Sequence, residues 1–205
     1  MAATNAPTVE NTTPRRGRGR PRNSESYRAI LEAAAELLAT GGFETLTIDA
    51  VAAKVRCSKA TIYRRWTSKL RLAIDALAEL PDPPLPDRGS VRADLRELLG
   101  GMIEIFNDTP AVAVMQSLIG ERARNPELAS LLDEAFQKRR DGLCEVLQRA
   151  IGRGELPAHT DVELTMDLLV GPLLTRLFCT GAPITADLID ALVESALVGC
   201  GAASS

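Results

Sequence analysis

Histidine and paired cysteines, on which many active sites and metal centres depend, are nearly missing from this 205-residue chain. Its one histidine is His159, and its four cysteines, at positions 57, 144, 179 and 200, form no Cys-x-x-Cys pair. These residues cannot be combined into a zinc site of familiar spacing. The sequence also contains no phosphate-binding glycine loop and no nucleophile elbow. It therefore predicts a protein that is not an enzyme and that uses no metal or cofactor.

Aromatic residues and long apolar runs are also scarce. Aromatics make up 3% of the chain, whereas Ala and Leu are abundant and apolar residues recur at helical spacing. This pattern predicts an all-α protein of about nine helices. No run reaches the roughly 18 apolar residues that span a bilayer, and no signal peptide is recognisable. We therefore expect a cytoplasmic protein with no membrane partner.

The net charge of −3 hides an uneven distribution of charge along the chain. Residues 1–80 contain 13 Lys and Arg against 8 Asp and Glu, a balance of +5, whereas residues 81–205 contain 11 against 19, a balance of −8. A cationic front half joined to an acidic rear half indicates that only the front half meets a polyanion.

Residues 1–23 are rich in Thr, Asn, Pro, Gly and Arg, and we expect them to form a disordered basic arm. Within this arm, Arg18-Gly19-Arg20-Pro21 resembles an AT-hook, whose arginines enter a narrow A·T minor groove. The candidates for that contact are Arg18, Arg20 and Arg22. The alternative is a basic tail that binds phosphates without sequence preference.

The stretch from Ser58 to Trp66 is expected to form a short helix with two different faces. Ser58 is a good N-cap, so the helix begins at Lys59. At about 100° per residue, Ile62 and Trp66 share one side and anchor the helix in a small core. The other face offers groups that suit base edges and phosphates in a major groove: Ala60, Thr61, Tyr63, Arg64 and Arg65. Taken alone, the pattern also fits an amphipathic helix with a solvated cationic face.

Two further helices are predicted before this stretch. The first runs from Ser26 to Thr40 and stops at Gly41-Gly42, and the second is a short helix capped by Thr47. A tight connection then leads to Ser58. Two short helices joined by a tight turn, the second presenting polar groups outward, form the helix-turn-helix pattern.

Two runs of residues carry a resemblance to a known family: Thr47-Ile48-Asp49-Ala50-Val51-Ala52 and Ser58-Lys59-Ala60-Thr61-Ile62-Tyr63-Arg64-Arg65-Trp66-Thr67-Ser68-Lys69. They resemble the DNA-binding domain of the tetracycline-repressor (TetR) family of bacterial transcriptional regulators, over roughly residues 24–75. The resemblance implies that base edges are faced by Lys59, Ala60, Thr61 and Arg64. It implies that DNA phosphates are contacted by Thr47, Ser58, Tyr63, Arg65 and Lys69.

Three positions in this region need comment. The helical wheel places Lys59 nearer the inner side, from which it reaches DNA only through its long stem. Trp66 stands where the family usually has Phe and is expected in the core. Arg56 stands in the turn where the family commonly has Gly. If that turn requires a positive φ, Arg56 is strained there, and its side chain is a candidate for an extra phosphate contact.

The proline-rich segment 81–89 separates two expected domains. A DNA-binding domain with a linking fourth helix, capped by Ser68 and ending near Leu80, covers residues 24–80. A regulatory and dimerisation domain covers residues 90–205. Its helices are expected after Ser90, at residues 111–119, after Asn125 to Gly152, after Thr160 or Asp161 with a kink at Pro172, and after Thr185.

The last two helices are apolar on opposite sides and have few neighbours in the chain. The resemblance implies that they pair with a second subunit, and a homodimer interface is placed on residues 162–200. The candidates are Leu168, Leu188, Ile189, Leu192, Val193, Ala196 and Leu197. The alternative is that these residues only complete the core of a monomer.

The resemblance also implies a pocket for a small-molecule effector inside the second domain. The candidate wall residues are Met102, Phe106, Met115, Leu118, Phe136, Met166, Leu169, Leu173, Arg176 and Phe178. Met and Phe at helical spacing also fill ordinary cores, which is the alternative for each of them. Arg176 is a candidate partner for an anionic ligand or for a neighbouring Glu.

Together these features predict a dimeric repressor of transcription. A twofold dimer presents two recognition helices to a palindromic operator in double-stranded DNA, and a small-molecule effector releases it. The alternative function is that of an architectural DNA-binding protein without an effector, which binds with little sequence preference and a steep salt dependence.

Overall fold

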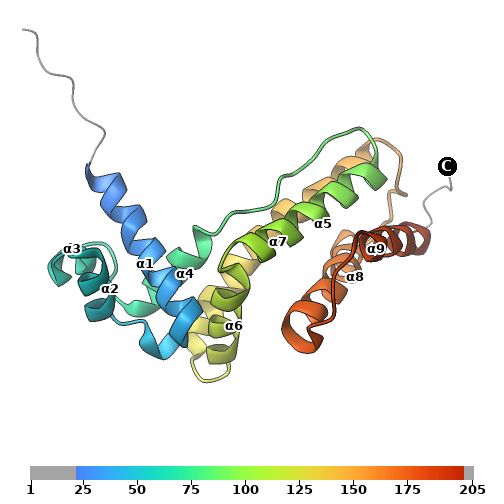
Figure 1. Cartoon of the computed structure of the whole chain (residues 1–205). Helices are drawn as coiled ribbons and strands as arrows, with labels where there is room; N and C mark the ends of the chain where they lie inside the picture. The colour runs from blue at the N-terminus through green and yellow to red at the C-terminus, as the bar shows by residue number, and fades with distance from the viewer. Residues whose placement is uncertain (1–21, 201–205) are drawn as a thin grey trace, which may run out of the picture.

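The computed structural model describes residues 22–200, with side chains described from residue 24. This part of the chain is all helical, as predicted (Figure 1). Arg18 and Arg20 lie outside the described residues, as does the side chain of Arg22. The elements are α1 (Arg22–Thr45), α2 (Ile48–Val55), α3 (Lys59–Tyr63), α4 (Lys69–Ala78), α5 (Val91–Asp108), α6 (Ala111–Arg122), α7 (Pro126–Gly152), α8 (Val162–Thr175), a π turn (Arg176–Thr180) and α9 (Ala186–Gly199).

Side-chain caps fix most of the helix starts. The backbone N–H three residues further on donates to the side chain of the cap in six cases, so these starts agree with the prediction. The six caps are Thr47, Ser58, Ser68, Asn125, Asp161 and Thr185. At position N1 of α7, Pro126 follows Asn125, as expected.

Four helices differ from their predicted bounds. Helix α3 ends at Tyr63, before Trp66, and α6 runs on to Arg122 instead of ending at residue 119. The first helix begins at Arg22 instead of Ser26, so Arg22 belongs to a helix and not to a separate arm. Gly42 interrupts this helix with φ 77° and ψ −177°, which agrees with the expected stop. Near the C-terminus, α8 passes through Pro172 and ends at Thr175, and the backbone then widens into the π turn before Gly181.

The buried side chains form two separate cores. The first core joins α1–α4 to α6 and to the start of α7, up to Leu132. The second core joins α5 to the rest of α7, from Cys144, and to α8 and α9. Figure 1 shows this division, with α1–α4 and α6 at one end of the molecule and α8 and α9 at the other. The boundary between the two cores therefore crosses α7 and does not follow the linker at residues 81–89.

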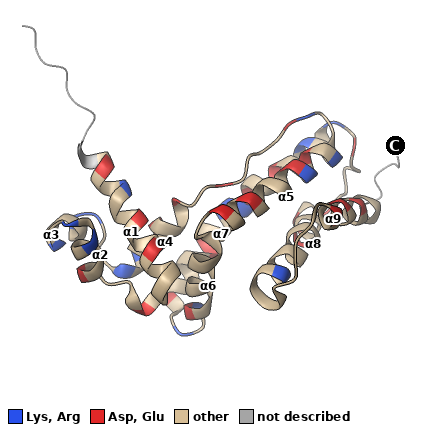
Figure 2. Cartoon of the chain, viewed as in Figure 1, with Lys and Arg blue, Asp and Glu red and all other residues tan. Residues whose placement is uncertain are grey.

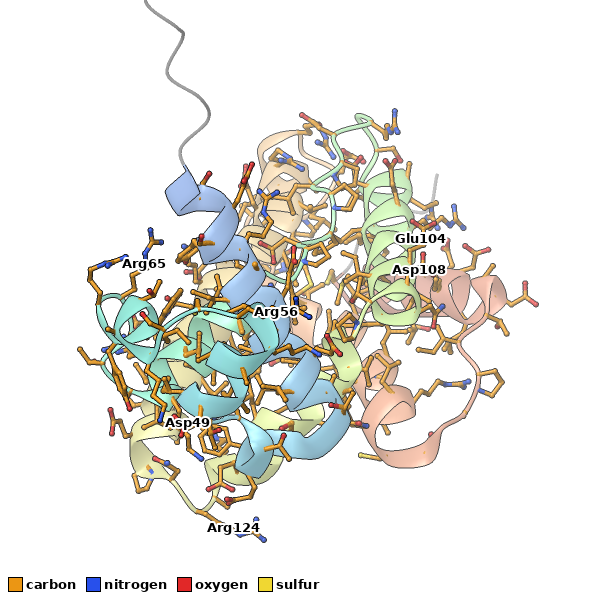
Figure 3. All side chains as sticks on the ribbon, turned by 60° about the vertical axis from the view of Figure 1, so that its left-hand side comes forward. Asp49, Arg56, Arg65, Glu104, Asp108 and Arg124 are labelled. Atoms are coloured by element: carbon orange, nitrogen blue, oxygen red, sulfur yellow. The ribbon has the colours of Figure 1, made fainter. Side chains whose placement is uncertain are left out.

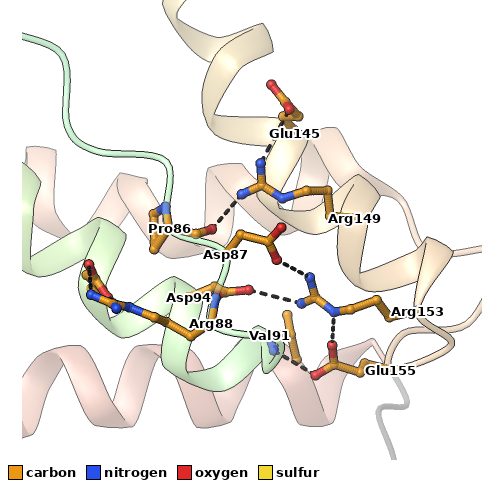
Figure 4. Close-up of polar contacts among 10 residues, drawn as sticks. Pro86, Asp87, Arg88, Val91, Asp94, Glu145, Arg149, Arg153 and Glu155 are labelled. Carbon is orange, nitrogen blue, oxygen red and sulfur yellow. Dashed lines mark hydrogen bonds and ion pairs between the residues drawn. The ribbon is translucent and has the colours of Figure 1, made fainter.

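A polar network fastens the linker to α5 and α7 (Figure 4). The buried carboxylate of Asp94 accepts from the backbone N–H of Arg88 at 2.6 Å and from Arg153 at 3.0 Å. Arg153 also pairs with Asp87 at 3.0 Å and with Glu155, whose other oxygen accepts from the backbone N–H of Val91 at 2.6 Å. One guanidinium thus ties the linker to the start of α5 and the end of α7.

No single helix among residues 22–200 is long and apolar enough to cross a membrane, and α5 with α6 passes that test only as a pair bent by 85°.

Candidate nucleic-acid interface and cavity

The inner face of α3 is fixed by two buried side chains. Ile62 is 0% exposed and Trp66 2% exposed, as the sequence predicted. The indole N–H of Trp66 donates to Asp75 of α4 at 2.8 Å. Trp66 therefore fastens α3 to α4 by packing and by a hydrogen bond. The spacing of apolar residues predicted the burial of Trp66 but gave no sign of its partner.

The outer face of α3 points to solvent. Ala60, Tyr63 and Arg64 are exposed, and Tyr63 is 53% exposed. Thr61 is half-buried, and its hydroxyl lies 2.9 Å from that of Ser58. A small residue, an aromatic hydroxyl and a guanidinium therefore share one accessible surface.

Arg65 lies in a stack of side chains. Its guanidinium carbon lies 5.1 Å from the ring centre of Tyr27, and that ring stacks on Trp66 at 5.3 Å with an interplanar angle of 19°. The stack restricts the guanidinium before any ligand arrives. The part that Tyr27 plays could not be predicted from the sequence, because nothing in the spacing of α1 indicates a contact with Arg65 or Trp66.

The two lysines predicted to contact DNA are turned towards protein partners. The ammonium of Lys59 lies 2.7 Å from a carboxylate oxygen of Asp49 on α2, and this pairing raises the pKa of Lys59. The ammonium of Lys69 lies 4.1 Å from the ring centre of Phe43 and 3.5 Å from its carbonyl oxygen.

Thr47 is exposed, and its hydroxyl accepts from the backbone N–H of Ala50 at 3.0 Å.

Arg56 has φ 53° and ψ 44°, the one positive φ of a non-glycine residue in the described chain. Its backbone N–H caps the end of α2 by donating to the carbonyl of Ala53 at 3.3 Å. The turn therefore needs the left-handed conformation that glycine adopts most easily. The side chain of Arg56 is exposed.

The two ends of the molecule differ in the sign of their charged side chains. Figure 2 shows Lys and Arg on α3 and Asp and Glu along α9. In Figure 3, Arg56 and Arg65 come from the α2–α3 unit, whereas Glu104 and Asp108 come from α5, on the other side of the view. Lys and Arg thus gather on α3, at the helix-turn-helix end, and Asp and Glu on α9, at the other end.

A cavity of about 810 Å³ lies between the two cores. Its walls come from the linker, the second half of α5, α6, the middle of α7, α8 and the π turn. Six of the ten predicted wall residues line it: Met102, Phe106, Met115, Phe136, Met166 and Phe178. The other four are placed elsewhere. Leu118, Leu169 and Leu173 are 0% exposed inside the two cores, and Arg176 donates to the carbonyl of Pro183.

Arg139 joins this cavity to α4. It lines the cavity, and its guanidinium donates to the carbonyl oxygens of Leu77 at 3.1 Å and Leu80 at 2.7 Å. It also lies 2.7 Å from Asp82 in the linker. One side chain of α7 therefore holds the end of the helix that follows the helix-turn-helix. This role could not be predicted from the sequence, because these partners lie about 60 residues away.

Helices α8 and α9 bury part of the predicted dimer interface inside the chain itself. Val193, Ala196 and Leu197 are at most 4% exposed in the second core, which leaves them almost no area for a partner. Leu188, Ile189 and Leu192 are half-buried, and Leu168 is 55% exposed. The same two helices also expose Leu164 and Val198, which the prediction did not include, at 54% and 72%.

Two family models match this chain. One, described as bacterial regulatory proteins of the tetR family, matches residues 30–76, and the other, described as the tetracyclin repressor-like C-terminal domain, matches residues 85–196. The first match ends before the proline-rich linker at residues 81–89, and the second begins within it.

Individual proteins resemble the chain along most of its length. An uncharacterized HTH-type transcriptional regulator, YdeS of Bacillus subtilis, is 34% identical over 191 residues, which cover 92% of this chain and 96% of YdeS. A DNA-binding transcriptional repressor TetR of Mycobacteroides abscessus is 31% identical over 178 residues, covering 83% and 90%. The crystal structure of the TetR family transcription regulator SCO0332 superposes with a TM-score of 0.69 at 32% identity, covering 85% of this chain and 98% of SCO0332.

Proposed function

The chain belongs to the TetR family of bacterial transcriptional regulators, and from this membership we propose that it is a homodimeric repressor released from a palindromic operator by a small-molecule effector. The outer face of α3 carries the proposal, because it presents Ala60, Thr61 and Arg64 on a helix whose other face is locked into the core. Membership in the family makes the chain a DNA-binding regulator, and the steps below concern how it acts.

Base reading is assigned to the exposed face of α3, and phosphate binding to its surroundings. A guanidinium such as that of Arg64 can donate two hydrogen bonds to a guanine edge, and the methyl group of Thr61 suits thymine. Tyr63 and Arg65 lie beside this face, where they suit phosphates. Lys59 and Lys69 reach DNA only after leaving Asp49 and Phe43.

Dimerisation is assigned to the exposed apolar side of α8 and α9. Leu164, Leu168 and Val198 are each more than half exposed, and an exposed apolar patch marks a protein–protein interaction site. They replace the buried Val193, Ala196 and Leu197 as the centre of the proposed interface. Of the three exposed residues, only Leu168 was also among the candidates predicted from the sequence.

Release by an effector is assigned to the cavity between the two cores. The core that holds the recognition helix and the core that holds the proposed interface meet at this cavity, so a ligand that favours one arrangement of the cores changes the spacing of the two DNA-binding ends. Arg139 supports such a coupling, because it contacts the cavity and the end of α4 at once. Arg139→Gln is expected to leave operator binding in place and to reduce the effect of an effector on it.

Selection of bound sequences from random duplexes tests the proposal. The full chain is expected to enrich inverted repeats whose half-sites lie about one helical turn apart or somewhat further. Enrichment without symmetry would contradict the dimeric arrangement, and no enrichment at all would favour an architectural DNA-binding protein.

A further inference from the structure

The cavity gathers residue types that are rare in the rest of the chain. The sequence has four methionines and four phenylalanines. All three methionines after Met1 and three of the four phenylalanines line the cavity, whereas only three leucines of a leucine-rich chain do so. The six Met and Phe side chains come from α5, α6, α7, α8 and the π turn, so they cover several walls. This concentration indicates that the walls are specialised for a ligand.

Thioethers and phenyl rings together favour aromatic ligands. Methionine is flexible and its sulfur makes favourable contacts with ring edges, while phenylalanine packs against another ring by stacking or edge to face. A volume of about 810 Å³ is sufficient for a ligand of drug size. The walls therefore suit a flat aromatic molecule better than a sugar or a peptide.

The charged residues around the cavity are balanced except at one position. Three arginines of the lining pair with three aspartates of the lining: Arg122 with Asp133, Arg139 with Asp82 and Arg140 with Asp167. The remaining charged residue is Lys138, which is exposed and makes no ion pair among the described residues. The lining therefore has one uncompensated positive charge, at Lys138.

We propose that the effector is a flat aromatic molecule with a single anionic group, whose rings lie against the Met and Phe walls and whose anion pairs with Lys138. This inference rests on the proposed function, in which the cavity is the effector site. The other cations of the lining are already paired, so a second anionic group on the ligand has no free partner among the lining residues.

Two fluorescent probes with the same aromatic skeleton test the ligand class on the full chain. Anilinonaphthalene sulfonate carries one negative charge, and phenylnaphthylamine carries none. The sulfonate is expected to bind about fivefold more tightly at low salt, the upper range for an exposed ion pair, and to lose this advantage at about 1 M salt. Lys138→Gln is expected to remove the advantage and leave binding of the neutral probe unchanged, whereas Lys138→Arg retains it.

Two matched variants locate the probes. Phe178→Ala removes a ring from the cavity wall and is expected to weaken both probes at least severalfold. Leu168→Ala, on the exposed face of α8 outside the cavity lining, is expected to change neither. Thermal unfolding of each variant shows whether it remains folded.

Three results would overturn the proposed ligand class. These are equal binding of the two probes, a sulfonate advantage that survives Lys138→Gln, and tighter binding of decanoate, an aliphatic anion, than of the aromatic sulfonate. Operator binding measured in the same samples separates this inference from the proposed function. If the probes behave as expected but the sulfonate never weakens operator binding, release by an effector is contradicted and the ligand class stands.

Discussion

Arg56 shows that a single backbone angle at the junction of two helices carries a stability cost of its own. Its left-handed conformation allows its N–H to cap α2 and turns the chain into α3, but its Cβ is crowded there. Sequence reasoning located this position, because related domains commonly have glycine in the turn. The angle itself, φ 53°, comes from the structure.

Arg56→Gly is expected to raise the free energy of unfolding by about 0.5–1 kcal/mol, because glycine adopts this conformation without the crowding. Arg56→Ala retains the Cβ and removes the guanidinium, so its stability should match that of the wild type. Chemical denaturation measures both. A glycine variant less stable than the alanine variant would contradict the strain. Weaker DNA binding shared by both variants would identify a phosphate contact from the side chain.

Arg64 and Lys69 are expected to affect DNA binding in different ways. Arg64→Ala removes a base-facing guanidinium and should reduce discrimination at one position of each half-site by about 1–3 kcal/mol. Lys69→Ala should weaken all sequences alike, because Lys69 lies off α3 and beside Phe43. Titrations against single-base variants of an operator test both expectations. The reverse pattern would show that the two faces have been misassigned.

At the scale of elements, the starts of helices could be predicted from neighbouring residues, whereas contacts between helices could not. Ser, Thr, Asp and Asn caps act on backbone groups three residues away, so the starts of α2, α3, α4, α7, α8 and α9 could be read from the sequence. The network around Arg153 could not be predicted, because its partners Asp87 and Asp94 lie about 60 residues away along the chain. Lys59 and Asp49 are only ten residues apart, but their ion pair depends on how α2 packs against α3, which the sequence does not show.

The network gives the chain a predicted dependence of stability on pH. Burial disfavours the charged form of Glu155, but hydrogen bonds from the Val91 N–H and from Arg153 outweigh it and lower the pKa of Glu155. The pKa in the folded state is thus below the unfolded value of about 4.3. The stabilisation is therefore present above about pH 4.3 and is lost as the pH falls through the folded pKa.

Glu155→Gln is expected to lower the free energy of unfolding by about 1.5–3 kcal/mol at neutral pH, the range for a hydrogen bond to a charged group. The difference from the wild type should shrink below about pH 4.3. Gln148→Glu, at an exposed site on α7, provides a control for a general change of charge. A difference that stays constant between neutral pH and pH about 3.5 would contradict the role given to this carboxylate.

At the scale of the whole molecule, the first core crosses the domain boundary that the sequence predicted, whereas the second core lies wholly after it. The linker prolines correctly mark a break in the helices, but α6 and the start of α7 join the core of α1–α4. Hydrophobic periodicity indicates which face of a helix is buried and not which partner buries it. Periodicity alone therefore could not separate the six predicted residues that line the cavity from Leu118, Leu169 and Leu173, which are buried in the two cores.

The exposed face of α8 and α9 gives a direct prediction about assembly. Leu168→Glu introduces a charge into the proposed interface and is expected to convert a dimer to a monomer at micromolar concentration, with little change in the stability of the fold, because Leu168 is 55% exposed. Sedimentation equilibrium measures the change. Gln148→Glu should remain dimeric. A wild-type chain that sediments as a monomer, or a Leu168→Glu variant that stays dimeric, would contradict this interface.

The central claim is that two copies of the α3 surface, held by one dimer, read a specific sequence. The most direct measurement compares the affinity of the full chain for its selected inverted repeat with its affinity for a duplex of the same composition in scrambled order, at physiological salt. We predict a ratio of at least about a thousand, as for specific DNA-binding proteins. Equal affinities for the two duplexes would contradict the account.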